Sequence, residues 1–253
     1  MSAPALRGSA LLGRRAFLKM RRNPASVMGA VMFPLLFFGL FMLVMQKVMQ
    51  AQGFDYQQLL PSTIVVQAAF FTAMSSAYFI AEDRHNGLGA RFRSMPIAAV
   101  APLVGRSLAD LARACVSVLV LLAVGIAAGM RFTAGWGWLP AYVAVAVAFA
   151  LAAALAMGLI GHLASSPAAA VTIASLPYLP LLMLSSGFVP VSNFPGWFQP
   201  LARHQPVTAT IDALRALAGN GDIATTTAQS LAWSFGLIVM FGLIGTWRMG
   251  RVS

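Results

Sequence analysis

Long apolar runs separated by short polar or turn-forming segments dominate the pattern along this chain. A helix that rises about 1.5 Å per residue needs about 20 apolar residues to cross a hydrocarbon core of roughly 30 Å. The segments that reach this length are residues 26–45, 61–81, 107–130, 138–161, 168–189 and 227–247. The pattern predicts an all-α integral membrane protein with six transmembrane helices in a single transmembrane domain, residues 1–253.

The segments outside these runs predict shorter elements. Residues 1–25 form a basic cytoplasmic segment, and residues 11–22 within it are amphipathic, as in a helix that lies in the membrane interface. Residues 190–226 form an extracytoplasmic loop that is too apolar to be free and too rich in proline to span. This loop predicts short re-entrant or interfacial helices between spans five and six. Pro177 and Pro180 predict a kink in span five, because each removes a backbone hydrogen bond.

Basic residues are distributed unequally between the two sides of the predicted spans. One side receives twelve of them: Arg7, Arg14, Arg15, Lys19, Arg21, Arg22, Arg84, Arg91, Arg93, Arg106, Arg248 and Arg251. The other side receives four: Lys47, Arg131, Arg203 and Arg215. Since cytoplasmic loops carry the excess of lysine and arginine, both termini are predicted to be cytoplasmic. Arginine far outnumbers lysine, as in GC-rich bacteria, so we expect a multi-pass protein of a bacterial cytoplasmic membrane.

Composition agrees with this class of protein. Hydrophobic residues make up 59% of the chain and charged residues 9%, whereas soluble domains carry about 25% charged residues. The formal net charge of +11 comes from basic residues that flank apolar runs, which favours contact with anionic lipid over nucleic-acid binding. Cys115 is the only cysteine, so an intrachain disulfide and a cysteine-based metal site are excluded.

The residues needed for catalysis or nucleotide binding are missing from the pattern. The middles of the spans lack ionisable residues, and His85, His162 and His204 have no metal-ligand spacing. The glycine-rich loop that binds nucleotide phosphates is also missing. We therefore expect no enzyme activity, metal or cofactor in this chain, and any ATP consumed on its behalf must be bound by another chain. Asp110, near the start of span three, is spaced to pair with either Arg106 or Arg113.

Polar and small residues inside the spans suggest helix contacts or a pathway. The candidate substrate path consists of Thr63, Gln67, Thr72, Ser75, Pro177 and Pro180. The alternative is that these polar groups bond to the backbone and to neighbouring helices. Small residues at helical spacing predict close packing within the chain, and they are Gly125 and Gly129 in span three and Ala144, Ala148, Ala152 and Ala156 in span four.

The cytoplasmic loop of residues 82–106, called the arm below, is the only cytoplasmic loop between spans that is long and charged enough to be gripped by a partner. Its candidate coupling residues are Glu82, Asp83, Arg84, Gly87, Arg91, Arg93 and Pro96.

On the opposite side of the membrane, aromatic residues surround a Pro-Gly turn that precedes an amphipathic stretch. We expect Phe194, Trp197, Phe198, Pro206 and Arg215 to form an outer gate, with a passive interfacial anchor as the alternative.

Two motifs in matching topological places resemble the ABC-2 family of ATP-binding-cassette permeases, of the daunorubicin-resistance type. Pro206 precedes Arg215 by nine residues, the spacing of that family's signature near its last span, although Val207 and Ala209 depart from its usual residues. In the arm, the matching residues are Glu82, Gly87, Arg91, Pro96 and the pair Gly105-Arg106.

This resemblance implies the permease subunit of an exporter for a hydrophobic or amphiphilic substrate, such as a drug, a lipid or a secondary metabolite. It implies two permease chains, identical or paired with a sister permease, and two cytoplasmic ATPase subunits that bind ATP and Mg. The arm would then contain the coupling helix that fits the ATPase. The alternatives are an ATP-independent carrier or channel and a membrane-embedded enzyme or assembly scaffold.

Overall fold

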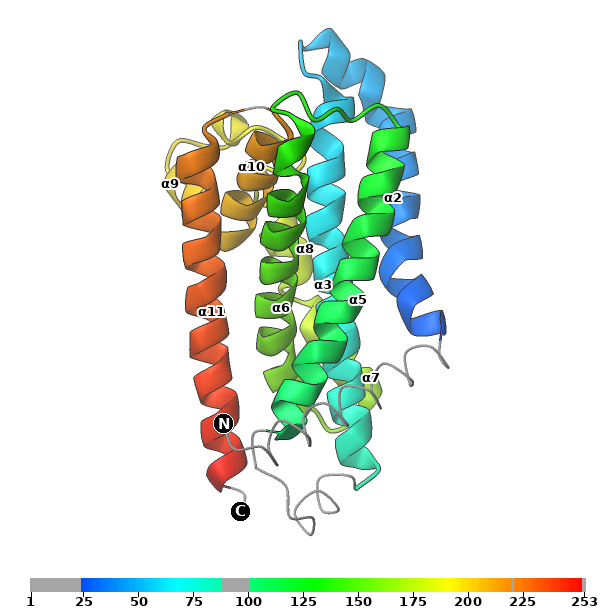
Figure 1. Ribbon diagram of the computed structural model, residues 1–253, viewed down its shortest axis with the longest axis vertical. Coiled ribbons are helices and arrows are strands. Elements are labelled where there is room, and N and C mark those ends of the chain that lie inside the picture. Colours follow the sequence, from blue (N-terminus) through cyan, green and yellow to red (C-terminus); the bar gives the residue numbers. More distant parts are fainter. Residues whose placement is uncertain (1–23, 88–100, 220, 252–253) are drawn as a thin grey trace.

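The computed structural model describes residues 24–87, 101–219 and 221–251, and within them the chain is helical, with no β-strand. The long helices are α2 (Pro24–Ala51), α3 (Tyr56–His85), α5 (Ala101–Ala127), α6 (Leu139–Leu163) and α11 (Ile223–Arg251). The shorter helices are α7 (Pro167–Ser175), α8 (Tyr178–Met183), α9 (Gln199–His204) and α10 (Pro206–Ala218), with 3-10 turns η1 (Trp136–Trp138) and η2 (Val191–Asn193). Together they form an elongated bundle with α11 at one edge and α2 at the other (Figure 1).

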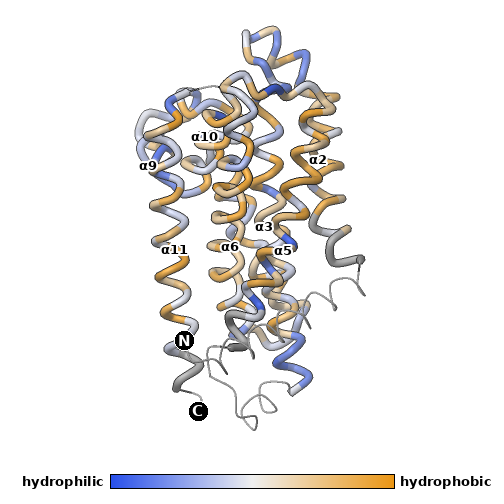
Figure 2. The backbone as a smooth tube through the Cα atoms, viewed as in Figure 1, coloured by the Kyte–Doolittle hydropathy of each residue, from blue (hydrophilic) through white to orange (hydrophobic). Residues whose placement is uncertain are grey.

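Five helices in the described part of the chain are long and apolar enough to cross a membrane. Their apolar stretches are Val31–Ala51, Tyr56–His85, Gly105–Ala127, Trp136–Leu163 and Ile223–Trp247. These helices confirm predicted spans one to four and span six. Figure 2 shows apolar residues along the length of the bundle and hydrophilic residues gathered towards its two ends. The interfacial helix predicted within residues 11–22 lies outside the described residues.

The fifth predicted span is not one continuous helix, which corrects the expectation for residues 168–189. The chain forms α7 and α8 there, separated by a turn at Leu176 and Pro177. Pro177 has no N–H to donate to the carbonyl of Ile173, and that carbonyl accepts instead from the N–H of Leu176 at 3.3 Å. The prolines therefore mark the right place, but they interrupt the helix rather than bend it.

The centre of the bundle is α3, which packs against α2, α5, α6, α7 and α10. It approaches α6 closely at Gly161. A Cβ atom added there would lie 2.5 Å from the carbonyl oxygen of Ala77 and 2.9 Å from the Cβ of Ile80. On α5, a Cβ added at Gly125 would lie 2.9 Å from the Cβ of Pro61. Small residues therefore pack helices together within this chain, as expected for Gly125.

The buried face of α6 differs from the predicted one. Ala152 is buried, but Ala144 of the predicted face is exposed. The buried face carries larger side chains, among them Tyr142, Val145 and Phe149. Because α6 is apolar on all sides, its sequence has no polar face from which the buried face can be identified.

The two ends of the bundle hold different elements. The short helices α9 and α10 lie near the start of α11, and we call this the α10 end (Figure 1). The start of α2, the end of α3 and the end of α11 lie at the opposite end, called the arm end (Figure 1). Short helices between the last two predicted spans are therefore confirmed. Ile211, Leu214 and Leu217 of α10 are fully buried, so α10 lies within the protein rather than on its surface.

The start of α11 at the α10 end is fixed by Asp222. The Oδ1 atom of Asp222 accepts hydrogen bonds from the N–H groups of Ala224 at 3.0 Å and Thr225 at 3.3 Å. The hydrogen bond from the Thr225 side chain, followed by those from the backbone, lowers the pKa of this carboxyl below its ordinary value. The last helix therefore begins at a defined residue at this end of the bundle.

Candidate functional site

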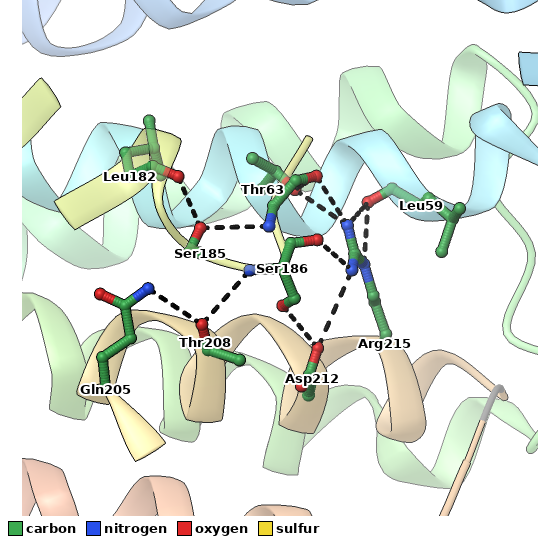
Figure 3. Close-up of polar contacts among 10 residues, drawn as sticks. Leu59, Thr63, Leu182, Ser185, Ser186, Gln205, Thr208, Asp212 and Arg215 are labelled. Carbon is green, nitrogen blue, oxygen red and sulfur yellow. Dashed lines mark hydrogen bonds and ion pairs between the residues drawn. The ribbon is translucent and has the colours of Figure 1, made fainter. Parts of the chain in front are cut away.

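A cluster of polar groups joins α10 to α3 and to the turn that follows α8 (Figure 3). We call it the α10 cluster, and its members are Leu59, Thr63, Leu184, Ser185, Ser186, Gly187, Gln205, Thr208, Asp212 and Arg215. These residues come from three separate stretches of sequence. The cluster therefore fixes elements that are not adjacent along the chain.

The guanidinium of Arg215 is the centre of the α10 cluster. Its Nη1 donates to the carbonyl of Ser186 at 2.8 Å, and its Nη2 donates to the carbonyl of Gly187 at 2.8 Å. Both Nε and Nη2 lie 3.3 Å from the carbonyl oxygen of Leu59, which accepts from them. Nη2 also donates to Thr63 Oγ1 at 3.2 Å. One planar cation thus satisfies three backbone carbonyls on two elements, which suits the fixed fork of an arginine.

The rest of the α10 cluster holds the turn after α8 against α10. Asp212 Oδ1 lies 3.8 Å from Arg215 Nη1 and accepts from Ser186 Oγ at 2.7 Å. Thr208 Oγ1 accepts from the N–H of Ser186 at 3.2 Å, and Gln205 donates to the carbonyl of Leu184. Since these contacts recur at successive helical turns of α10, the segment that follows α8 is bound along the helix rather than at one point.

The far end of α10 is also fixed. The carbonyl of Ala218, the last residue of α10, accepts from the N–H of Thr133 at 3.0 Å and from Gln58 Nε2 at 3.3 Å. On the other side of α10, Ser230 of α11 donates to Thr210 at 3.1 Å. Gln58 was not identified from the sequence, because a glutamine at the start of a helix has no distinguishing pattern. As a result α10 is bound at both of its ends and along its middle.

The structure divides the predicted outer gate into two parts. Pro206 and Arg215 belong to α10, and Arg215 is largely buried. The aromatic residues lie before α9, where the ring of Phe198 contacts the rings of Phe194 and Trp197. Trp197 is 82% exposed, so its side chain is available to lipid or to a partner protein.

The candidate substrate path lies where α3 meets the broken pair α7–α8. Thr63 donates to the carbonyl of Gly187 at 2.8 Å, and Gln67 Nε2 donates to the hydroxyl of Tyr178 at 2.6 Å. The other half of the Gln67 amide, Oε1, is buried without a hydrogen-bond partner, as is Thr72 Oγ1. Ser75 donates to the carbonyl of Phe71 within α3.

Pro177 and Pro180 belong to the facing pair of helices, and Pro180 is exposed. The polar residues of α3 that belong to the candidate path thus lie beside α8, and they are packed against their neighbours. Thr63 and Gln67 bond to neighbouring elements, which is the alternative that their positions in the sequence left open.

At the arm end, the structure describes the base of the arm. Arg106 Nη1 of α5 lies 3.1 Å from Asp83 Oδ2 of α3. Arg84 Nη1 donates to the carbonyls of His162 and Ala164, at the end of α6. Gly87 follows α3 with a φ of +67°, a left-handed conformation that suits glycine. Of the predicted coupling residues, Arg91, Arg93 and Pro96 lie outside the described residues.

A buried ion pair within α5, further into the bundle, is hydrogen-bonded to α3. Arg113 Nη1 lies 3.0 Å from Asp110 Oδ1, and Ser76 Oγ donates to Asp110 Oδ2 at 2.7 Å. The guanidinium of Arg113 also lies 5.3 Å from the centre of the Phe79 ring. The predicted pairing of Asp110 with a nearby arginine is therefore confirmed for Arg113. The bond from Ser76 to a neighbouring helix agrees with its polar position in span two, but its partner Asp110 was not predicted, because contacts between α3 and α5 depend on tertiary packing.

Comparison with known proteins identifies the chain's relatives. Residues 9–218 match the family described as ABC-2 type transporter. The chain belongs to this family. It is 29% identical over 232 residues to the probable doxorubicin resistance ABC transporter permease protein DrrC of Mycobacterium tuberculosis (strain CDC 1551 / Oshkosh), covering 89% of this chain and 82% of that protein.

Two further relatives carry similar names. The doxorubicin resistance ABC transporter permease protein DrrB of the same strain is 31% identical over 202 residues, which cover 77% of this chain and 69% of that protein. The daunorubicin resistance ABC transporter permease protein DrrB1 of Streptomyces coeruleorubidus is 25% identical over 241 residues, covering 94% of this chain and 83% of that protein.

Family membership settles the broad role of the chain. It is a multi-pass ABC-2 permease of the cell membrane, homologous to permeases of drug-resistance exporters. An ABC-2 permease lacks a nucleotide-binding domain and carries no cofactor, because a partner ATPase binds the ATP. The chain is therefore a transport subunit rather than an enzyme.

Proposed function

We propose that this chain is the membrane-spanning permease of an ATP-driven exporter that moves a hydrophobic or amphiphilic substrate out of a bacterial cell. The observation that carries the proposal is the extent of the likeness to permeases named for doxorubicin and daunorubicin resistance, which covers 89% and 94% of this chain in two cases. Two permease chains, identical or of two kinds, and two ATPase subunits make up the proposed transporter. The substrate is a drug, a lipid or a secondary metabolite.

The proposed path runs between α3 and the broken pair α7–α8. Gln67 has one half of its amide bonded to Tyr178 and the other half buried without a partner, which is costly away from water. Separation of α8 from α3 exposes these polar groups to a substrate or to water. The break at Pro177 supports this proposal, because it lets α8 move without dragging a continuous helix.

The proposed gate lies at the α10 end, which we assign to the outside of the cell. There Arg215 holds the turn after α8 closed against α3 and α10, while Phe194, Trp197 and Phe198 form an aromatic cap. The arm, residues 82–106, contacts the partner ATPase at the opposite end, on the cytoplasmic side.

The test of the proposed function is capture of a cytoplasmic ATPase by the tagged chain, followed by measurement of ATP hydrolysis by the purified complex. Doxorubicin, daunorubicin and a phospholipid are the probes, because they sample the proposed substrate classes. Stimulation of ATP hydrolysis by one of them supports the proposal. Transport of these probes by the chain alone, without ATP, would show an independent carrier and overturn it.

Replacement of the arm's charged residues Glu82, Arg91 and Arg93 together by alanine is expected to abolish capture of the ATPase. Charge-assisted contacts with a partner are worth about 1.5–3 kcal/mol each, so the loss of three removes most of a typical binding free energy. The measurement is ATPase recovery with the tagged permease from solubilised membranes. Insertion is expected to be unchanged, because Glu82 lies at the end of α3 and Arg91 and Arg93 lie beyond the predicted spans. Unchanged capture would show that the arm does not bind the partner.

The assigned orientation predicts labelling of engineered cysteines from opposite sides. In a background with Cys115→Ala, Gln52→Cys between α2 and α3 is expected to react with an impermeant thiol reagent added to whole cells. His85→Cys, which is exposed at the end of α3, is expected to react only after the cells are opened. The reverse pattern would invert the topology and remove the outer gate from the outside of the cell.

A further inference from the structure

The base of the arm contains contacts that link three helices. Asp83 lies near the end of α3, and Arg106 lies in the first turns of α5, so their ion pair joins the point where the chain leaves the bundle to the point where it returns. Arg84, the neighbour of Asp83, donates to carbonyls at the end of α6. These contacts thus connect α3, α5 and α6 at the base of the arm.

We propose that Asp83, Arg84 and Arg106 form a clamp that makes the arm and the ends of α3, α5 and α6 move as one body when the ATPase pulls on the arm. This inference rests on the proposed function, since it concerns coupling to an ATPase. Asp83, Arg84 and Arg106 are positioning residues. They act by transmitting a displacement, whereas Arg91 and Arg93 are proposed to contact the partner.

The geometry of the ion pair supports this role. When the two ends of a loop are not in contact with each other, a pull on the loop can change the distance between its ends. The helices that carry the loop then do not move together. The contact of 3.1 Å between Arg106 Nη1 and Asp83 Oδ2 fixes that separation. The two side chains are 23% and 30% exposed, so the pair is partly screened by water and adds little to the overall stability of the fold.

A second contact between the same helices lies further into the bundle. Asp110 follows Arg106 by one helical turn, about 6 Å, and accepts from Ser76 of α3. Asp110 in turn pairs with Arg113. Two polar contacts at different depths prevent α3 and α5 from sliding past each other, so a displacement of the arm is carried into the bundle.

Arg84 extends the clamp to α6. The last carbonyls of an α-helix have no partner within the helix, and a cation there is also favoured by the helix dipole. Arg84 supplies this cation from another helix, through the carbonyls of His162 and Ala164. Because α7 begins at Pro167, directly after this turn, the contact places the start of the broken pair α7–α8 within reach of the clamp.

Charge reversal tests the clamp, because exchanging both residues restores a pair of opposite charges. Asp83→Arg and Arg106→Asp are made singly and together, and each permease is purified with its ATPase. The single reversals are expected to lower substrate-stimulated hydrolysis about tenfold relative to the basal hydrolysis of the same complex, the size of a typical coupling between sites. The double reversal is expected to restore stimulation. His85→Asp changes the charge of an exposed neighbour and serves as the matched control.

A second measurement on the permease alone separates the clamp from the proposed function. Amide hydrogen exchange at the last turn of α3 and the first turns of α5 is expected to quicken in each single reversal and to return to the parent rate in the double reversal. Arg84→Gln is expected to lower stimulated hydrolysis and to quicken exchange at the end of α6. Single reversals that leave both exchange and stimulation unchanged would overturn the clamp.

The remaining outcomes are also decisive. If the single reversals lower stimulated hydrolysis and the double reversal does not restore it, the two residues act separately. That result overturns the proposed pair. Loss and rescue of exchange protection in a permease that captures no ATPase would refute the proposed function and reduce the clamp to a structural ion pair. Transmission through Asp83 and Arg106 is supported only if the single reversals lower both exchange protection and stimulated hydrolysis and the double reversal restores both.

Discussion

Arg215→Ala is expected to lower the stability of the purified permease more than any other single change in the α10 cluster. The guanidinium donates to the carbonyls of Leu59, Ser186 and Gly187, and alanine leaves these three acceptors without that donor. It also leaves Asp212 without its positive partner. Hydrogen bonds to a charged group contribute about 1.5–3 kcal/mol each, so the loss of these bonds is expected to cost about 3–5 kcal/mol, to which the partly exposed pair with Asp212 adds little. For a chain of this size that corresponds to a melting temperature lower by roughly 10 °C.

The loss of Arg215 is also expected to change ATP hydrolysis and export by the complex. Without Arg215 the turn after α8 keeps its bond to Thr63 of α3 but loses its charged link to Leu59, so the closed state of the proposed outer gate is weakened. Substrate-independent ATP hydrolysis is expected to rise and export of the probe substrate to fall. Melting temperature, basal hydrolysis and export are measured on the same preparations.

Two variants make this test specific. Arg215→Lys keeps the charge but has a single donor group that cannot reach the separated carbonyls, so an intermediate loss is expected. Arg203→Ala removes an exposed arginine from the neighbouring helix α9 and is expected to leave stability and export unchanged. If Arg215→Ala melts and exports like the parent, the α10 cluster does not hold the gate.

The aromatic cap is tested by the double change Trp197→Ala and Phe198→Ala. These side chains lie before α9 and are separate from the buried guanidinium, so the double variant is expected to keep its melting temperature while its basal ATP hydrolysis changes. If hydrolysis and export stay at the level of the parent, the aromatic residues are passive anchors in the membrane interface.

The second large effect is expected from Gly161→Ala. The new Cβ would lie 2.5 Å from the carbonyl oxygen of Ala77 and 3.0 Å from its Cα, both of which belong to the α3 backbone and cannot rotate away. Overpacking of this kind costs about 1–3 kcal/mol, and backbone contact places Gly161 at the upper end. We expect a lower melting temperature and separation of α6 from α3 at the arm end.

Gly158→Ala is the matched control, one turn earlier on the same helix. There the new Cβ would meet only the Cδ1 atom of Ile80, at 3.0 Å, and this atom is the end of a flexible side chain. Alanine also favours the helix over glycine by about 1 kcal/mol. Gly158→Ala is therefore expected to be neutral or stabilising. Equal melting temperatures for the two variants would show that the close approach at Gly161 does not limit packing.

Features that depend on local chemistry were predicted correctly from the sequence. Five of the six predicted spans are long apolar helices, because length and hydropathy alone decide whether a helix can cross a bilayer. The irregularity at Pro177 was placed correctly but predicted as a kink rather than a break, since a proline removes a hydrogen bond wherever it occurs. The pairing of Asp110 with Arg113 followed from their spacing of three residues.

Features that depend on tertiary contacts could not be predicted from the sequence. Arg215 stood out because of its spacing from Pro206, but its partners are backbone carbonyls, which every residue has. Arg106 was an equal candidate for Asp110, yet it pairs with Asp83, from which it is 23 positions away in sequence. The buried face of α6 was assigned to its alanines, whereas the structure buries Tyr142 and Phe149, because a helix that is apolar all round fits a core in any rotation.

The ion pair within α5 also bears on how this helix enters the bilayer during synthesis. An aspartate or an arginine is costly within an inserting helix, by up to about 2.5–3.5 kcal/mol at its centre and by less towards its ends, where Asp110 and Arg113 lie. Asp110 and Arg113 are three residues apart on one helix, so they neutralise each other as soon as that turn has formed, before any other helix is in place. A pair divided between two helices would have to insert both charges unpaired. Biogenesis of α5 therefore does not have to wait for the bundle to assemble.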